Sequence, residues 1–234
     1  LSQNQIFDIT PLKYLKSLEI LQLYSNHLPD VSPISSMTNL RYLDISNCEI
    51  TDITCLSNLT SLEFLTIGNN PVFDISPISK LKNLKKLSFR ESALVDISAL
   101  STLTSLEQLD LAKNNIVDIS PLDSLDNLHR LSLGGNRIHD VSPLAGMSLL
   151  ETLGLTDNRI VDVSSLDSAS LENLDTLFLE GNMITDVPLF THLPNLRSLR
   201  ILAGNPLSEE SLEIIDQMKA RGISIPITTP PQAE

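Results

Sequence analysis

The stretch LEQLDLAKNNIVDISPLDSLDN, residues 106–127, contains the pattern that decides the fold. Leu109 and Leu111 alternate with their neighbours in the way of a short strand that buries one face. We therefore expect the residues between and after them, Asp110 and Ala112, to point outward. The Asn that follows marks a corner, and the second half of the stretch turns and runs back.

The pattern Leu-x-x-Leu-x-Leu-x-x-Asn recurs along the chain with a step of 22 residues, lengthened once to 24. Its first Leu stands at Leu18, Leu40, Leu62, Leu84, Leu106, Leu128, Leu150, Leu174 and Leu196. A fixed period of this length is typical of leucine-rich repeats, which bury a shared core only when they stack. We predict an α/β leucine-rich-repeat solenoid, a curved horseshoe with a parallel sheet on its concave side. Short helical or 3-10 turns are expected on the convex side, with a C-terminal capping helix.

A column of Asn residues is predicted to be structural. It comprises Asn4, Asn26, Asn70, Asn114, Asn136, Asn158, Asn182 and, displaced by one residue, Asn205. An inward-facing corner leaves backbone groups unpaired, and a carboxamide offers both donors and acceptors that can bridge adjacent turns. Cys48 and Ser92 replace Asn in two repeats, so we expect the column to be weaker there.

A second column is acidic, and it suggests either a calcium stack or a row of turn-forming side chains. It comprises Asp8, Asp30, Asp52, Asp74, Asp96, Asp118, Asp140, Asp162 and Asp186. Calcium-binding repeats are Gly-rich nonapeptides, unlike these. The position before a reverse turn favours local bonds from the Asp side chain to backbone N–H groups. In the same segment Ser120, which precedes Pro121, is expected to cap a short helix.

The predicted organisation is residues 1–205 as repeats, 206–225 as a C-terminal cap and 226–234 as a flexible tail. Because Leu1 and Asn4 occupy positions in the middle of a repeat, we expect the chain to be a fragment of a longer protein.

The predicted cap contains one helix. Ser208 is expected to be its N-cap. Leu212, Ile215 and Met218 are expected to share the face that covers the last repeat, with Leu207 and Leu212 spaced as a hydrophobic staple.

Composition excludes several classes of function. The net charge is −13, which disfavours nucleic acid and anionic membranes as partners. No apolar run is long enough for membrane insertion. The two cysteines, Cys48 and Cys55, are expected to be unpaired thiols, and neither zinc spacing nor a phosphate-binding loop is present. None of the four His falls beside a nucleophile and an acid, so we predict no enzyme, no cofactor and no metal site.

The outward residues of successive strands should stack at 22-residue intervals and form the concave face. At its N-terminal end, aromatic and aliphatic side chains form a predicted apolar patch with basic residues beside it, and such residues are favoured as interface anchors. The predicted partner-binding residues are Ile20, Tyr24, Arg41, Tyr42, Phe64, Lys86, Arg90 and Phe178.

Two interpretations of this patch remain open. The chain has only three Tyr and six Phe, so three rings in one patch favour binding. Ring contacts between adjacent strands also stabilise a sheet without any partner. Phe178, between Asp175 and Glu180, is a second, weaker candidate.

Several phrases resemble the 22-residue repeats of bacterial internalins. They are DISPL at 118–122, DVSPL at 140–144 and NNIVDISPL at 114–122. The ending NPLSEESLEIIDQMKARGISI, residues 205–225, resembles the capping helix of bacterial surface leucine-rich proteins. The resemblance implies a module that binds a protein, or alternatively a glycan, on its concave face, in a cell-surface or secreted setting. The same repeat class includes an intracellular phosphatase regulator, so a cytoplasmic scaffold is the alternative.

Overall fold

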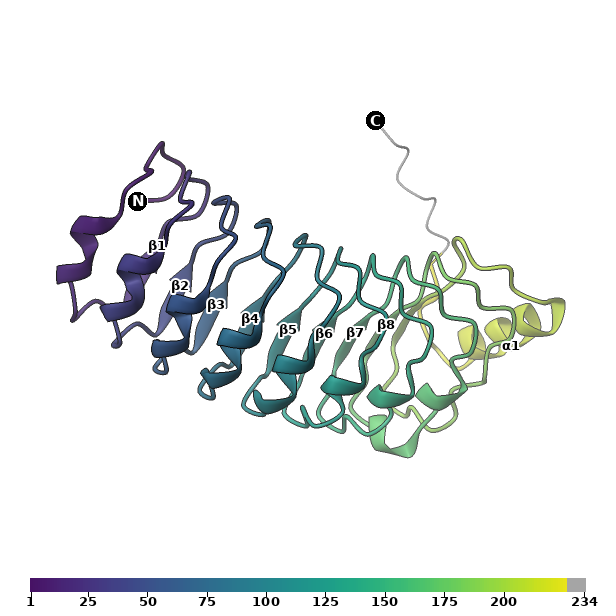
Figure 1. Ribbon diagram of the computed structural model, residues 1–234. Coiled ribbons are helices and arrows are strands. Elements are labelled where there is room, and N and C mark those ends of the chain that lie inside the picture. Colours follow the sequence, from purple (N-terminus) through teal and green to yellow (C-terminus); the bar gives the residue numbers. More distant parts are fainter. Residues whose placement is uncertain (227–234) are drawn as a thin grey trace. The chain divides into compact units, whose positions relative to one another are not determined.

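The computed structural model describes residues 1–226 (Figure 1). It contains two compact units, Leu1–Asn115 and Ile116–Glu234. Apart from Pro226, the predicted tail lies outside the described residues.

Unit 1 contains five strands, each paired in parallel with the next along the chain. They are β1 (Ile20–Gln22), β2 (Tyr42–Asp44), β3 (Phe64–Thr66), β4 (Lys86–Ser88) and β5 (Gln108–Asp110). Residues 22 apart are direct partners, so each repeat places its strand in the same register as its neighbour. The leucine-rich-repeat fold predicted from the period is therefore confirmed.

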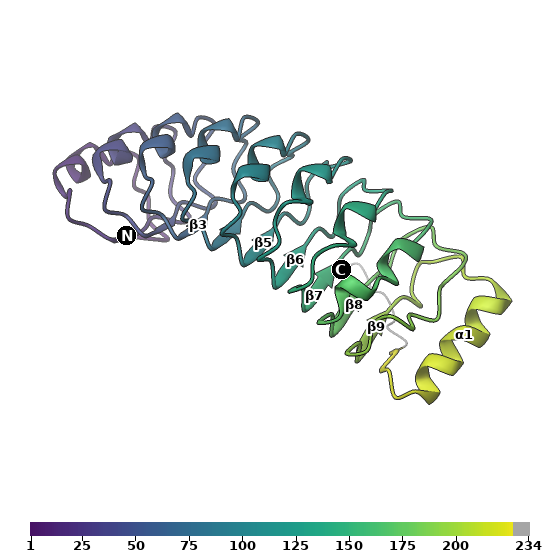
Figure 2. The same cartoon turned by 90° about the horizontal axis from the view of Figure 1, so that it is seen from below.

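The return segments of unit 1 are 3-10 turns. They are η1 (Thr10–Tyr14), η2 (Ser32–Ser36), η3 (Thr54–Asn58), η4 (Ser76–Lys80) and η5 (Ser98–Thr102). Figure 2 shows these turns along one side of the stack and the strands along the opposite side. We call the surface formed by the outward-pointing side chains of the strands the sheet face.

Unit 2 repeats this arrangement. Its parallel strands are β6 (Arg130–Ser132), β7 (Thr152–Gly154), β8 (Thr176–Phe178) and β9 (Ser198–Arg200). Its 3-10 turns are η6 (Ser120–Leu122), η7 (Ser142–Leu144), η8 (Ser164–Leu166) and η9 (Ala169–Leu171). The last two turns both lie within the lengthened repeat, which accommodates its two extra residues there.

The predicted strand alternation is confirmed, with one exception. Leu109 and Leu111 are buried, while Gln108 and Asp110 on either side of Leu109 are only half-buried. Ala112, expected to point to solvent, is buried instead. A methyl group extends little beyond the backbone, so the longer side chains around it cover it.

The Asp column caps the 3-10 turns. The carboxylate of Asp118 accepts the N–H of Ser120 at 2.8 Å, and the equivalent bonds of Asp30 and Asp74 are 2.8 Å each. The predicted local bonding is confirmed. The prediction that Ser120 is the N-cap is wrong, because Ser120 is the first residue of η6 and its N–H is the group being capped.

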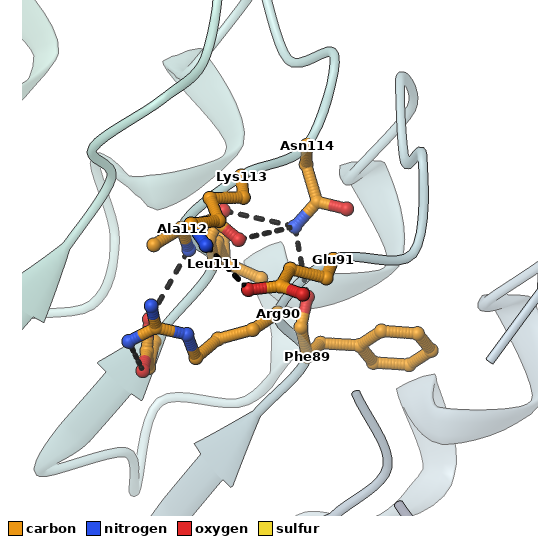
Figure 3. Close-up of polar contacts among 8 residues, drawn as sticks. Phe89, Arg90, Glu91, Leu111, Ala112, Lys113 and Asn114 are labelled. Carbon is orange, nitrogen blue, oxygen red and sulfur yellow. Dashed lines mark hydrogen bonds and ion pairs between the residues drawn. The ribbon is translucent and has the colours of Figure 1, made fainter. Parts of the chain in front are cut away.

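The Asn column forms the predicted bridges between turns (Figure 3). The side-chain oxygen of Asn114 accepts the N–H groups of Ser92 at 3.1 Å and Leu94 at 3.0 Å. Its NH₂ group donates to the carbonyl oxygens of Phe89 at 2.8 Å and Leu111 at 2.9 Å. One side chain thus satisfies backbone groups of two adjacent repeats.

Cys48 reproduces only half of this pattern. Its thiol donates towards the carbonyl oxygens of Leu23 at 3.2 Å and Ser46 at 3.3 Å, in place of the NH₂ group. It has no counterpart to the amide oxygen, and the N–H of Leu28 bonds instead to the backbone carbonyl of Cys48 at 2.9 Å. Cys48 thus makes two of the four backbone bonds that Asn makes at this position, and the local weakening stays a prediction.

Helix α1 (Glu209–Ala220) follows the last strand of unit 2. The hydroxyl of Ser208 accepts the N–H of Ser211 at 3.2 Å, which confirms the predicted N-cap. Ile215 and Met218 are buried as expected, but Leu212 is exposed. The buried stripe begins one residue earlier, at Ser211, because residues separated by four and seven positions share a helix face.

Candidate functional site

The strand register of unit 1 brings three predicted site residues side by side on the sheet face. Ile20 pairs with Tyr42, and Tyr42 pairs with Phe64. We call these three residues the aromatic patch. Ile20 is 64% exposed and Phe64 37% exposed, whereas Tyr42 is half-buried between them. The two ring centroids lie 6.2 Å apart with an interplanar angle of 32°. Three large side chains thus lie in adjacent register on the sheet face, two of them exposed to solvent.

Beside the rings lies a shallow depression of about 280 Å³. It is lined by Tyr42, Phe64, Leu65, Thr66, Lys85, Lys86, Glu107 and Gln108. This volume is just below the ~300–1,000 Å³ typical of small-molecule sites. The depression therefore suits one or two side chains of a partner better than a whole cofactor.

Lys86 stands next to Phe64 in the strand register and is exposed. Within residues 1–226, its ammonium group forms no ion pair with a carboxylate. It is thus a cation available at the rim of an apolar depression.

Arg41 lies one residue before β2, in the column beside the aromatic patch, and it is already paired. Its Nε and Nη2 atoms lie 2.7 Å and 2.6 Å from Oε1 of Glu63. Lys85 approaches the other oxygen of Glu63 at 3.3 Å. Hydrogen bonds from Arg41 and Lys85 lower the pKa of the Glu63 carboxyl. The arrangement is a short charge ladder along the edge of the sheet face.

Sequence reasoning missed this ladder, although its signal was present. The column one residue before each strand reads Glu19, Arg41, Glu63, Lys85 and Glu107, so its charge alternates from repeat to repeat. Opposite charges at adjacent positions of a parallel stack are expected to pair.

Two further predicted residues lie on the same face but outside the aromatic patch. Arg90 lies beyond β4, where its Nη1 atom contacts Oδ2 of Asp110 at 3.2 Å (Figure 3). Tyr24 lies beyond the end of β1 and is half-buried. The structure therefore groups Ile20, Tyr42 and Phe64 with Lys86 and leaves these two at the border.

Phe178 is in unit 2 and is half-buried. It pairs with Gly154 on one side and Arg200 on the other. The guanidinium carbon of Arg200 lies 5.4 Å from the ring centroid, which is cation–π distance. The ring face of Phe178 thus already has a cationic neighbour.

Neither cysteine favours nucleophilic chemistry, and two of the four histidines contact carboxylates. Burial raises the pKa of the Cys48 thiol, and burial raises that of Cys55 to about 12. His27 contacts Glu49 at 2.7 Å, and His192 contacts Asp167 at 3.4 Å. A thiolate nucleophile is disfavoured at both cysteines.

The described residues contain neither a metal-binding cluster nor a membrane-spanning helix. In residues 1–226, no three His, Cys, Asp or Glu side chains are grouped as a metal would require. Over the same range, no helix has the length and apolar character needed to cross a membrane.

Comparison with known proteins identifies the family. The family model for leucine-rich repeats (two copies) matches residues 38–82, 82–124, 126–168 and 172–216. A comparison with curated proteins gives no significant match.

Solved structures extend the comparison. An internalin (InlF) from Listeria monocytogenes is 31% identical over 93% of this chain and 76% of its own, with a TM-score of 0.73. Internalin C2 (InlC2) from the same species is 36% identical over 80% of this chain and 82% of its own, with a TM-score of 0.77.

A plant receptor shares the fold alone. The peptide hormone receptor RGFR1, in complex with RGF2, is 19% identical over 90% of this chain and 36% of its own, with a TM-score of 0.74. The repeat period, the paired Asn corners and the two Listeria structures agree: the chain belongs to the leucine-rich-repeat family and, within it, to the internalin-like proteins.

Proposed function

We propose that the chain is a non-enzymatic module that binds a protein partner on the sheet face of unit 1. The observation that carries this proposal is the aromatic patch, in which an exposed Phe64 ring and an exposed Ile20 flank a half-buried Tyr42. Water-facing apolar surface of this kind is a favoured anchor for a partner. The fold supports the same function, because RGFR1 shares it and was solved in complex with RGF2.

The charged residues at the rim of the depression indicate which chemistry a partner needs. Lys86 forms no ion pair within residues 1–226 and borders the depression beside Phe64. The neighbouring cations Arg41 and Lys85 are both held by Glu63. The site therefore suits an apolar side chain of the partner followed by a carboxylate that reaches Lys86.

The other predicted residues take supporting roles. Arg41 and Arg90, each paired with a carboxylate, form a polar border around the anchor. Phe178 is the second candidate anchor, in unit 2, with Arg200 over its ring.

The family supports a bacterial surface or secreted setting for this module. An intracellular scaffold or phosphatase-regulator-like role is the alternative. Locating the full-length protein by antibody labelling of intact and permeabilised cells distinguishes these settings.

To test the binding site, a partner is captured from surface extracts and purified, and its Kd for the chain is measured. The Tyr42→Ala, Phe64→Ala double variant should weaken its Kd about a hundredfold. Tyr14→Ala is the matched control, because it removes an exposed ring from η1, outside the sheet face, and should leave the Kd unchanged.

The Lys86→Glu variant tests the rim. It should weaken binding of the purified partner several-fold at low salt. The loss should be smaller at high salt, because salt screens the charge of Lys86. An unchanged Kd for the double variant would place the site elsewhere, with Phe178→Ala the next variant. A glycan array probed with the same variants tests the alternative ligand class.

A further inference from the structure

Unit 1 exposes a second apolar surface away from its sheet face. Phe73 is 74% exposed and Val95 is 62% exposed, so each is more exposed than Phe64 of the aromatic patch. Pro71 and Ala93 are exposed two residues earlier in the same repeats. We call these four residues the corner patch.

The corner patch spans two adjacent repeats in register. Phe73 and Val95 are 22 residues apart, the spacing of direct neighbours in this stack. Inter-repeat hydrogen bonds bracket them along the chain. Before the patch, the N–H of Asn69 donates to the carbonyl of Arg90 at 2.8 Å. After it, the hydroxyl of Thr102 donates to the carbonyl of Ser79 at 3.1 Å.

The backbone under the corner patch departs from the regular corner. Pro71 has no N–H to donate, and Ser92 stands where other repeats have Asn. The N–H of Val72 therefore turns back to the carbonyl of Asn70 in its own repeat at 2.8 Å. Ala93 adopts a positive φ of 59°, which is costly for a residue with a Cβ. The corner patch therefore lies over a corner that lacks one Asn bridge.

The border of the corner patch is acidic. Asp74 and Asp96 directly follow Phe73 and Val95. The hydrogen bond from the N–H of Ser76 lowers the pKa of Asp74, which keeps its carboxylate charged. An apolar centre with a negative border favours a partner of opposite charge.

We propose that the corner patch binds an extended segment of a partner protein in which aliphatic and basic side chains alternate. The aliphatic side chains cover Phe73 and Val95, and the Lys or Arg side chains reach the bordering carboxylates. The same carboxylates disfavour an anionic membrane as the occupant. This surface is separate from the sheet face, so the chain has two binding surfaces on one unit.

The test uses the full 234-residue chain and a fluorescent eight-residue peptide of alternating Lys and Leu, measured by fluorescence anisotropy. The Phe73→Ser, Val95→Thr double variant should bind this probe about tenfold more weakly or worse.

The matched control is the Phe7→Ser, Val161→Thr double variant. It makes the same substitutions at the same repeat position, on side chains that are also exposed but not adjacent. Its affinity should equal that of the parent chain. A probe of alternating Lys and Ser should bind at least tenfold more weakly than the Lys-Leu probe, and a Glu-Leu probe should not bind.

Three results would overturn the proposal. The first is equal affinity of the parent and the Phe73→Ser, Val95→Thr variant. The second is equal binding of the Lys-Leu and Lys-Ser probes, which would reduce the interaction to charge alone. The third is binding of the parent, and not of that variant, to vesicles of anionic phospholipid in preference to the peptide. Amide chemical shifts give an independent readout, since the probe should shift residues 72–73 and 93–95 and leave Tyr42 and Phe64 unmoved.

Discussion

The repeats that begin at Leu40 and Leu62 have two contrasting regions. Their corner buries a polar side chain, and their sheet face exposes apolar ones. At the corner, Asn70 is buried and all of its polar atoms bond to backbone groups. On the sheet face, Tyr42 and Phe64 bring apolar rings to solvent. The corner therefore contributes stability without binding anything, and the sheet face carries apolar surface that folding leaves uncovered. Substitutions at the two places should separate these roles.

The largest effect is expected from Asn70→Ala. The carboxamide accepts the N–H groups of Cys48 and Ile50 and donates to the carbonyls of Ile45 and Ile67. Removing it leaves buried backbone groups unpaired, at a cost of roughly 1–3 kcal/mol each. We expect the free energy of unfolding to fall by about 3 kcal/mol or more in urea denaturation.

Asn83→Ala is the control for this prediction. Asn83 is exposed and makes one bond, to the carbonyl of Thr60 at 2.9 Å. Its loss should cost less than about 1 kcal/mol. Equal losses for the two variants would mean that burial of the corner carboxamide adds nothing.

The second prediction concerns the stability of the Tyr42→Ala, Phe64→Ala variant. The two rings form one cross-strand pair on an open surface, and such pairs contribute roughly 0.2–1 kcal/mol. We expect the free energy of unfolding to fall by no more than about 1.5 kcal/mol, with the far-UV circular dichroism unchanged. A loss of about 3 kcal/mol or more would assign the rings to packing and contradict the proposed binding role.

These two regions also show what the sequence could and could not predict. The corners and strands follow from spacing, because a buried core repeats only if every repeat supplies the same apolar positions. Leu212 and Ser120 were misassigned, since a shift of one residue in a helix or turn leaves the pattern of residue types almost unchanged. The pairing of Arg41 with Glu63 needed side-chain geometry, because a charged residue beside a patch can face either the partner or its neighbour.

The residue types of the corner patch are the feature that the 22-residue period predicts least. Phe73 and Val95 occupy a position that holds Pro29 and Thr51 in the two preceding repeats, so no periodic rule marks it. This position is exposed in every repeat, so spacing predicts its exposure but not which repeats carry an apolar side chain there.

The third prediction concerns the Cys48→Asn variant, which restores Asn to a corner that lacks it. The new carboxamide keeps the donor bonds that the thiol makes to Leu23 and Ser46 and adds an oxygen that can accept the N–H of Leu28. We expect the free energy of unfolding to rise by about 1 kcal/mol. The reciprocal variant Asn70→Cys should lower it, by less than Asn70→Ala does. A loss of stability for Cys48→Asn would show that the corner at Glu49, where φ is 60°, has adapted to the thiol.

The smallest expected effect is a pH dependence of stability, which the charged Asp caps should show and the neutral Asn corners should not. Backbone N–H groups of Ser76 and Ser120 lower the pKa of Asp74 and Asp118 below the ordinary value of 3.8. A carboxyl whose folded pKa is depressed contributes stability above its unfolded pKa, and this contribution is lost as the pH falls through the folded pKa. The melting temperature should therefore be nearly flat from pH 7 to about 5 and fall below about pH 4.

In the Asp74→Asn, Asp118→Asn variant the amide oxygens can still accept the N–H bonds but bind no proton. Its melting temperature should lie slightly below the parent's at pH 7, and the gap should close on acidification. A gap that stays constant from pH 7 to below pH 4 would mean that these caps act through geometry alone, as the Asn corners do.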